Sequence, residues 1–304
     1  MDESPVINAL TVDVEDYFHV SAFADVIERD SWTSLESRVE RNTGKLLEIF
    51  DDASVSATFF VLGWVAERYP KLVQEIIENG HELACHGFSH QLIYTQSEKV
   101  FREETARAKK LLEDISGRKV AGYRAASYSI TDKSLWALQV LVDAGFEYDS
   151  SIVPVTHDLY GMANAGTYPY RLSLADGRSM IEFPPSTIRI AGRRISIGGG
   201  GYFRLFPYWF TKRGLNQINA RDKMPFSFYL HPWEIDPEQP RISAGWKSTF
   251  RHYNNLRKCE PRLLNLLKDF SFDTMSMVLD ELSPEVLDIA DLANPISTQQ
   301  DTVL

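Results

Sequence analysis

The chain has 304 residues, of which 44% are hydrophobic and 24% are charged, and its formal net charge is -10. This composition is typical of a globular protein that buries a core without disulfide bonds, and its acidity argues against nucleic acid as a partner. Two cysteines are too few for a secreted disulfide framework. The chain opens without a signal-peptide pattern and has no apolar run of about 18 residues. We therefore expect a cytoplasmic protein without a membrane span.

Strand and helix patterns alternate through the first half of the chain. Apolar and β-branched runs predict strands over 6–12, 56–61, 82–85, 120–124 and 146–149. Amphipathic patterns predict helices over 39–50, 70–79, 95–116 and 131–144, and Thr95 with Glu98 resembles a capping box. This alternation predicts βαβ units around a parallel sheet or barrel.

The second half of the chain is less regular. Strands are predicted over 181–185, 188–197 and 226–231, and helices over 207–219 and 250–267. Four glycines at 198–201 either let a glycan approach the backbone or form a flexible hairpin. We expect one domain over residues 1–282 and a flexible acidic tail over 283–304.

Acidic residues follow the first predicted strand, in the order Asp13-Val14-Glu15-Asp16. Active sites of parallel α/β folds gather beyond the carboxyl ends of their strands. Because alternate residues of a strand point the same way, Asp13 and Glu15 are expected to face one site. Asp16 reaches the same site if the chain has already turned.

Two histidines, His86 and His90, follow the third predicted strand. Imidazoles four residues apart converge on one metal ion if the segment makes a helical turn. Two histidines with one carboxylate form a typical hydrolytic zinc site that keeps an open coordination position. Arg124 and His231 also stand at predicted strand ends, which places four polar segments at one edge of the sheet.

These segments, in this order, resemble the polysaccharide deacetylases, which are carbohydrate esterase family four with its nodulation-factor deacetylase homology domain. The family pattern Thr-Phe-Asp-Asp, His-x3-His, Arg-x-Pro-Tyr and Leu-x-His is similar to segments that begin at Thr11, His86, Arg124 and Leu230. The chain departs from the family pattern at two places. The adjacent Asp pair of the family is split here as Asp13-Val14-Glu15-Asp16, and the Pro of the Arg motif is replaced by Ala126. The glycine run and the Asp13–His19 segment resemble the branch linked to bacterial exopolysaccharide and exosortase loci.

The resemblance implies a distorted (β/α) barrel of seven strands, and with the patterns above we expect an added β-hairpin and a C-terminal helix. It implies Zn²⁺ or another divalent ion on His86, His90 and either Glu15 or Asp16. Asp13, oriented by Arg124, would act as the base and protonated His231 as the acid. Asp149 is a candidate to raise the pKa of His231. A backbone N–H near Ser127 or Tyr128 would bind the oxyanion, and Trp233 is expected to contact substrate.

The function implied is removal of N-acetyl groups from amino sugars of a bacterial polysaccharide or its precursor. The partner expected is an N-acetylated glycan, and a homo-oligomer is compatible with the sequence. One alternative is a metal-assisted amidase on a small non-glycan substrate, and another is a non-catalytic glycan-binding protein. Trp209 and Trp246 either stack on sugar rings or fill the core.

Overall fold

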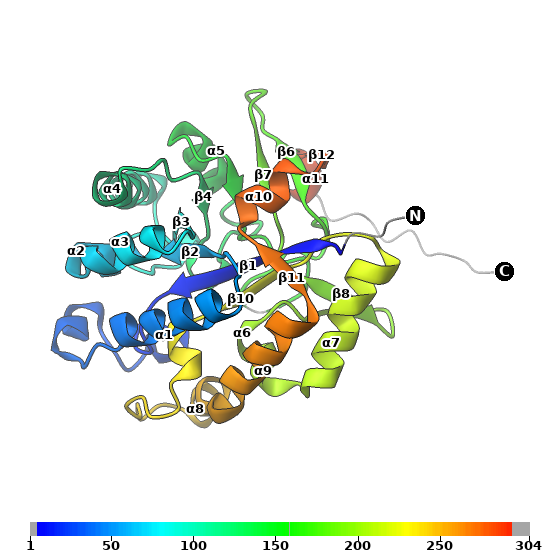
Figure 1. Cartoon of the computed structure of the whole chain (residues 1–304). Coiled ribbons are helices and arrows are strands. Elements are labelled where there is room, and N and C mark those ends of the chain that lie inside the picture. The colour runs from blue at the N-terminus through cyan, green and yellow to red at the C-terminus, as the bar shows by residue number, and fades with distance from the viewer. Residues whose placement is uncertain (1–4, 158, 294–304) are drawn as a thin grey trace.

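The computed structural model describes residues 5–157 and 159–293, which surround one large and mostly parallel β-sheet (Figure 1). Seven strands run parallel in the order β10-β1-β2-β3-β4-β5-β7. Within the described residues β7 and β10 do not pair, so hydrogen bonds do not close the barrel. The predicted α/β class with seven parallel strands is confirmed. These strands are β1 (Ile7–Val14), β2 (Thr58–Val61), β3 (Glu82–Cys85), β4 (Gly122–Tyr123), β5 (Tyr148–Asp149), β7 (Ser179–Glu182) and β10 (Ser227–Leu230).

The glycine run lies in the space between β7 and β10. The Tyr229 N–H donates to the Gly198 carbonyl at 2.7 Å, and Gly199 forms an isolated parallel bridge with Tyr229. Gly199 has a φ of 131°, and a Cβ built there would lie 1.9 Å from the Tyr229 carbonyl oxygen. Only glycine allows this approach. The run is therefore a tight backbone contact beside β10, and the flexible-hairpin interpretation was wrong.

Further strands extend the sheet beyond β7. Strand β6 (Tyr170–Ser173) pairs antiparallel with β7, β12 (Glu285–Asp288) pairs with β6, and β11 (Ser271–Asp273) pairs with β1. Strands β8 (Thr187–Ile190) and β9 (Arg193–Ser196) form a separate hairpin. The flexible tail predicted from residue 283 was wrong as far as residue 293, because β12 completes the sheet edge. Residues 294–304 lie outside the described part of the chain.

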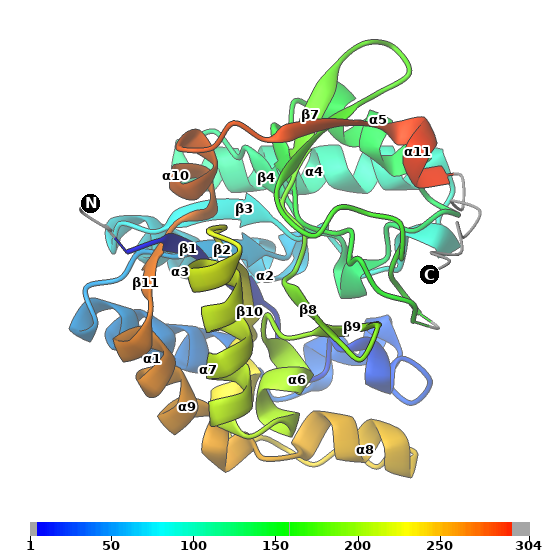
Figure 2. The same cartoon turned by 90° about the vertical axis from the view of Figure 1, so that its right-hand side faces the viewer.

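Helices surround the sheet, and α6, α7, α8 and α9 gather at one end of the molecule (Figures 1 and 2). Across the described residues, none of these helices combines the length and apolar character needed to cross a bilayer. Both cysteines, Cys85 and Cys259, are buried and free. The helices are α1 (Val39–Asp52), α2 (Gly63–Arg68), α3 (Pro70–Glu78), α4 (Glu98–Ser116), α5 (Trp136–Asp143), α6 (Gly200–Leu205), α7 (Tyr208–Asn216), α8 (Trp246–Tyr253), α9 (Leu256–Asp269), α10 (Met275–Asp280) and α11 (Ile289–Ala293).

Local sequence explains where several helices begin and end. Helix α4 starts after Ser97, whose hydroxyl accepts from the Val100 N–H, so the predicted cap at Thr95 was two residues early. It ends at Gly117, which adopts the left-handed conformation. The single helix predicted over 250–267 is instead two, because Asn255 has a φ of 54° and turns the chain between α8 and α9.

Candidate active site

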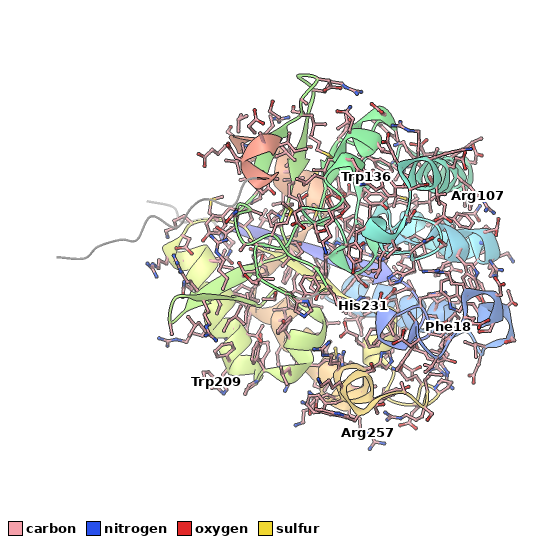
Figure 3. The ribbon with its side chains drawn as sticks, turned by 180° about the vertical axis from the view of Figure 1, so that it is seen from behind. Phe18, Arg107, Trp136, Trp209, His231 and Arg257 are labelled. Carbon is pink, nitrogen blue, oxygen red and sulfur yellow. The ribbon has the colours of Figure 1, made fainter. Side chains whose placement is uncertain are left out.

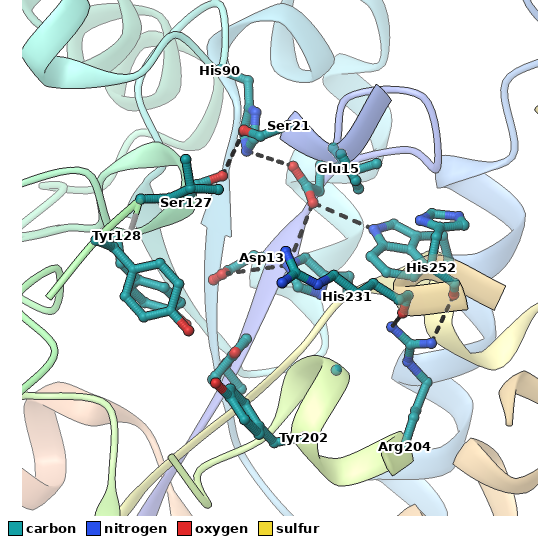
Figure 4. Close-up of a pocket in the computed structure, with 18 of the residues that line it drawn as sticks. Asp13, Glu15, Ser21, His90, Ser127, Tyr128, Tyr202, Arg204, His231 and His252 are labelled. Atoms are coloured by element: carbon teal, nitrogen blue, oxygen red, sulfur yellow. Dashed lines mark hydrogen bonds and ion pairs between the residues drawn. The ribbon is translucent and has the colours of Figure 1, made fainter. Parts of the chain in front are cut away.

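A cavity of about 450 Å³ opens beyond the carboxyl ends of β1, β3, β4 and β10 (Figure 4). Asp13 and Glu15 come from β1 and the residue after it, while His86 follows β3 and His231 follows β10. All four line the cavity, together with His90. The strand-end segments predicted to meet at one edge of the sheet therefore do meet. Parallel strands place these side chains together because their carboxyl ends share one edge.

Glu15, His86 and His90 form a compact group on the cavity floor. One ligand atom from each of them lies within 4.8 Å of the others. Glu15 Oε2 is 2.8 Å from His90 Nε2, and both side chains are almost fully buried. Burial opposes ionisation of Glu15, but the neighbouring imidazoles, His90 above all, hold the pKa of its carboxyl well below the ordinary value. An anionic carboxylate thus faces two imidazoles in a buried site.

The imidazole of His86 is fixed in one tautomer. Its Nδ1 lies 2.8 Å from the Arg124 carbonyl oxygen, which can only accept a hydrogen bond. Nδ1 therefore carries the proton, and the Nε2 lone pair is free to bind a ligand. Burial also lowers the pKa of His86 to about 4, so the ring is neutral. An oriented neutral imidazole is what metal coordination requires.

The two histidines converge through an irregular loop. Gly87 and His90 have φ values of 75° and 50°, and residues 86–90 contain no helical turn. The helical turn given as the condition for convergence is therefore absent, yet the two rings still converge, with centroids 5.4 Å apart. A positive φ at His90 is costly for a residue with a Cβ, and such strain is concentrated at functional sites.

Asp16, the second candidate for the carboxylate, faces away from the two histidines. Its Oδ2 accepts hydrogen bonds from the Arg38 and Val39 N–H groups at 2.7 and 3.1 Å and from the Ser37 hydroxyl at 2.8 Å. A carboxylate at the start of α1 satisfies N–H groups that lack helical partners and matches the positive end of the helix dipole. The structure contradicts Asp16 as a member of the histidine group and makes it a helix cap.

Asp13 is held by Arg124, as predicted. Arg124 Nη1 donates to Asp13 Oδ1 at 2.6 Å and to the Thr11 hydroxyl at 2.8 Å. Thr11 and Asp13 are two residues apart on β1, so strand alternation places both in front of the guanidinium. Arg124 is fully buried and lies 4.1 Å over the Phe60 ring. The second Asp13 oxygen, Oδ2, is 3.9 Å from His231 Nε2 and faces the cavity.

Arg124 is itself supported by the residues after β5. Its Nε and Nη2 donate to the carbonyl and hydroxyl oxygens of Ser150 at 3.2 and 2.9 Å. Ser151 accepts from the Ala125 N–H and donates to Asp149, which lies opposite Glu182 on β7. Burial raises the pKa of Asp149 to about 6 and that of Glu182 well above its ordinary value. Asp149 therefore belongs to a buried carboxyl pair beneath Arg124, and its predicted role at His231 was wrong.

Glu234 occupies the place predicted for Asp149. Its Oε2 lies 3.0 Å from His231 Nδ1 and accepts the His231 backbone N–H at 3.0 Å. Its Oε1 accepts from Arg204 Nε at 2.6 Å, and Arg204 also donates to the carbonyls of His252 and Asn254 at 2.7 and 3.0 Å. Burial acts to lower the pKa of the His231 imidazole. The nearby carboxylates outweigh burial, with Glu234 contributing more than Glu15, and raise this pKa to about 9. A protonated imidazole thus faces the cavity at neutral pH.

Sequence reasoning missed both Glu234 and Arg204. One signal was present, because an acidic residue three positions after the first residue of a turn is the capping-box pattern, here with His231 as the cap. Arg204 lies on α6, 30 residues before Glu234, and no local pattern connects them.

The remaining predicted residues line the cavity in different ways. The Trp233 ring stacks on His231 with centroids 5.0 Å apart, and its indole N–H points to Glu15 at 3.4 Å. Trp233 is 4% exposed, so it supports these side chains more than it offers a surface to a sugar. Ser127 Oγ lies 2.7 Å from Ser21 Oγ. The Tyr128 N–H already donates to the Ala125 carbonyl, which removes it as an oxyanion donor.

The Tyr128 hydroxyl is a donor at the cavity that the sequence did not suggest. Its oxygen is buried and has no hydrogen-bond partner among the described residues. Burial raises the pKa of this phenol well above its ordinary value, so it keeps its proton. An O–H group without a partner in a cavity is available to a ligand.

Two family models match the chain and together cover most of it. Residues 28–148 match the polysaccharide deacetylase model, and residues 150–280 match a domain of unknown function, DUF3473. The first match contains His86, His90 and Arg124, and the second contains His231 and Glu234.

Curated relatives that match the chain include two deacetylases. The chain is 27% identical over 139 residues to a peptidoglycan deacetylase of Helicobacter pylori, which covers 46% of this chain and 43% of that protein. It is 29% identical over 99 residues to a chitooligosaccharide deacetylase of Azorhizobium caulinodans, covering 33% and 45%. The chain thus spans less than half the length of these relatives.

A crystal structure of a Mycobacterium smegmatis protein, named as a candidate polysaccharide deacetylase, shares the fold with a TM-score of 0.58. The two are 22% identical, and the superposition covers 94% of this chain and 95% of that one.

Association with exopolysaccharide loci stays a prediction. The chain contains a match to the polysaccharide deacetylase domain over residues 28–148.

Proposed function

We propose that the protein is a divalent-metal-dependent hydrolase that removes N-acetyl groups from amino sugars of a bacterial polysaccharide or its precursor. One observation carries this proposal. A buried group of one carboxylate and two imidazoles lies between an Arg-held aspartate and a Glu-held histidine in a single cavity. A glycan-binding protein has no need for a base, an acid and a metal-ligand set in one place.

The residues of the group fit a divalent ion. Glu15 Oε2 is buried without a geometrically good hydrogen-bond partner, although it lies close to His90 Nε2. His86 is neutral and presents Nε2 to the same point. Two imidazole nitrogens and one carboxylate oxygen are a donor set typical of hydrolytic zinc, and three protein ligands leave a position for substrate. When bound, the ion would polarise the acetyl carbonyl and lower the pKa of water.

Asp13 is suited to accept the proton of the attacking water. Arg124 holds Oδ1 and leaves Oδ2 directed at the cavity. The guanidinium fixes the rotamer of the Asp13 carboxyl group, so that a base is available in one orientation. Since Arg124 is anchored by Ser150, the orientation of Asp13 depends on the end of β5 as well as on β1.

His231 is suited to donate a proton to the departing amine. Glu234 binds Nδ1 and thereby points Nε2 at the cavity, where it lies 3.4 Å from Glu15 Oε1. The raised pKa keeps the ring protonated at neutral pH, which an acid catalyst requires. The negative charge that develops on the acetyl oxygen can be met by the Tyr128 hydroxyl, which has no competing partner among the described residues.

The test is acetate release from N-acetylated chito-oligosaccharides by purified protein whose metal content is measured by elemental analysis. We expect turnover that a chelator abolishes and that Zn²⁺ or another divalent ion restores. His86→Ala should lose the metal, whereas His81→Ala, a buried histidine before β3 that binds the Ala57 N–H, should retain it. Hydrolysis of ureide-type compounds without acetate release would favour the small-amide alternative. Glycan binding by metal-loaded protein without acetate release would favour a binding protein.

A further inference from the structure

Charge is distributed very unevenly along this acidic chain. The whole chain has a formal net charge of -10, yet residues 241–268 carry seven basic side chains and one acidic side chain, Glu260. This basic segment forms α8 and the greater part of α9, which lie together at the lower edge of Figures 1 and 2. The basic residues are Arg241, Lys247, Arg251, Arg257, Lys258, Arg262 and Lys268.

The same segment exposes two large aromatic side chains. Trp246 is 76% exposed and Phe250 is 54% exposed, and both belong to α8. At about 100° per residue, Trp246, Phe250, Lys247 and Arg251 fall in one sector of roughly 140° of the helix surface. No acidic residue occurs in α8, and its buried side is marked by His252. A solvent-facing sector of two aromatics and two cations is unlike the polar outer face of an ordinary surface helix.

This surface is continuous with the mouth of the catalytic cavity. Phe250 lines the cavity, as do Leu205 of α6 and Leu159, which are 47% and 50% exposed. Trp209, which is 66% exposed, lies at the same lower edge of the molecule as Arg257 in Figure 3, away from Arg107 and Trp136. Leu159, Leu205 and Phe250 therefore form a cluster of exposed apolar side chains at the cavity mouth, whereas Met277 and Val286 are exposed on other elements.

Helix α8 is also held firmly against the catalytic wall. Arg204, which binds Glu234, donates to the backbone carbonyls of Arg251, His252 and Asn254 at the end of α8. His252 stacks on Trp233 with ring centroids 4.2 Å apart. Whatever binds the outer face of α8 is thus fixed in position relative to His231.

We propose that this face, comprising the outer sector of α8 with Leu205 and Leu159, docks on the surface of an anionic lipid bilayer. Trp246 and Phe250 would enter the headgroup region, where aromatic side chains are favoured, and Lys247 and Arg251 would contact anionic headgroups. An acidic protein is repelled by such a surface unless it presents basic groups to it, and Lys247 and Arg251 in the outer sector of α8 supply them. Docking would place the cavity mouth at the bilayer, where a membrane-held glycan is within reach. The inference is independent of catalysis, because bilayer binding is measured without turnover.

Co-sedimentation of the full chain with vesicles tests the proposal. We expect binding to vesicles of phosphatidylcholine with phosphatidylglycerol, little binding to phosphatidylcholine alone, and loss of binding in high salt, because screening weakens attraction to the headgroups. Lys247→Glu/Arg251→Glu should weaken binding about tenfold or more, since each basic residue near an anionic surface contributes about fivefold. Trp246→Ser/Phe250→Ser should weaken it by a similar factor. Equal binding of wild type to neutral and anionic vesicles would overturn the proposal.

Matched controls separate docking from general effects of charge or exposed apolar area. Met277→Ser removes a 52% exposed side chain from α10, at the opposite end of the molecule from α8, and should leave vesicle binding unchanged. Lys71→Glu on α3 reverses a charge away from α8 and should also leave vesicle binding unchanged. If the aromatic variant bound vesicles like wild type while Trp246→Ser alone raised KM for soluble oligosaccharides, the aromatics would be a sugar subsite and the bilayer proposal would be wrong.

Discussion

The charge of Glu234 should set the pH range over which His231 works as an acid. Glu234→Gln preserves the size of the side chain and an oxygen that can accept from the His231 backbone N–H and Nδ1. It removes the negative charge that opposes the effect of burial on this imidazole. The pKa of His231 should therefore fall from about 9 toward its ordinary value of 6.5. A cation held by Glu15 would offset the contribution of Glu15 but not that of Glu234, which binds the other ring nitrogen.

The sign and size of the effect on rate follow from the role of His231. An acid must be protonated, so kcat should fall as pH rises through the pKa of this group. The alkaline limb of the pH profile should consequently move down by about one to two pH units in Glu234→Gln, and each unit lowers the protonated fraction about tenfold above both pKa values. Activity below pH 6 should change much less, because the ring is protonated in both proteins.

The assay is the pH dependence of kcat for acetate release, with thermal unfolding measured in parallel. Loss of the charge leaves buried Arg204 with only carbonyl partners, so some loss of stability is expected. Asp236→Asn is the matched control, since Asp236 is a buried carboxylate two residues away that pairs with Arg38 and Arg41. It should cost stability without moving the alkaline limb. An unchanged limb in folded Glu234→Gln would refute the assignment of His231 as an acid tuned by Glu234.

Three further predictions concern the base, the ligands and the buried carboxyl pair. Asp13→Asn should lower kcat by about 10² to 10⁴ while metal content stays near wild type; some loss of stability is expected because buried Arg124 loses its charged partner, and unchanged turnover of the folded variant would remove Asp13 from the mechanism. Glu15→Gln should lower metal stoichiometry, whereas Asp16→Asn should keep the metal and lose about 1–2 kcal/mol of stability as a weakened cap, and the reverse result would exchange their roles. Asp149 binds its proton more tightly in the folded than in the unfolded chain, so stability should fall as pH rises from 3.8 to about 6. The slope should be about 1.4 kcal/mol per pH unit for one proton, and urea unfolding of Asp149→Asn, which removes the titrating carboxyl group, should show it flattened.

Local periodicity was enough to predict which strand-end residues share the cavity. The alternation on β1 places Thr11 and Asp13 on one side, and each further polar segment follows its own strand, so a parallel sheet brings them to a common edge. What periodicity could not supply was any contact made across the fold. Glu234 is held by Arg204, and the segment predicted as a tail joins the sheet by pairing β12 with β6. No pattern in the sequence near these residues predicts either contact.

The choice between Glu15 and Asp16 shows why residue type alone was a poor guide to the ligand. The two acids are adjacent, so the chain cannot direct both at the histidines without a sharp reversal. Glu15 continues the side of β1 that already carries Asp13 and meets His90 at 2.8 Å. Asp16 falls on the other side, where the start of α1 presents N–H groups to a carboxylate. Turning Asp16 toward the histidines would leave those N–H groups without their present acceptor. Which carboxylate joins the histidines in the proposed metal site is therefore set by how α1 packs beside β1, which is a property of the folded chain.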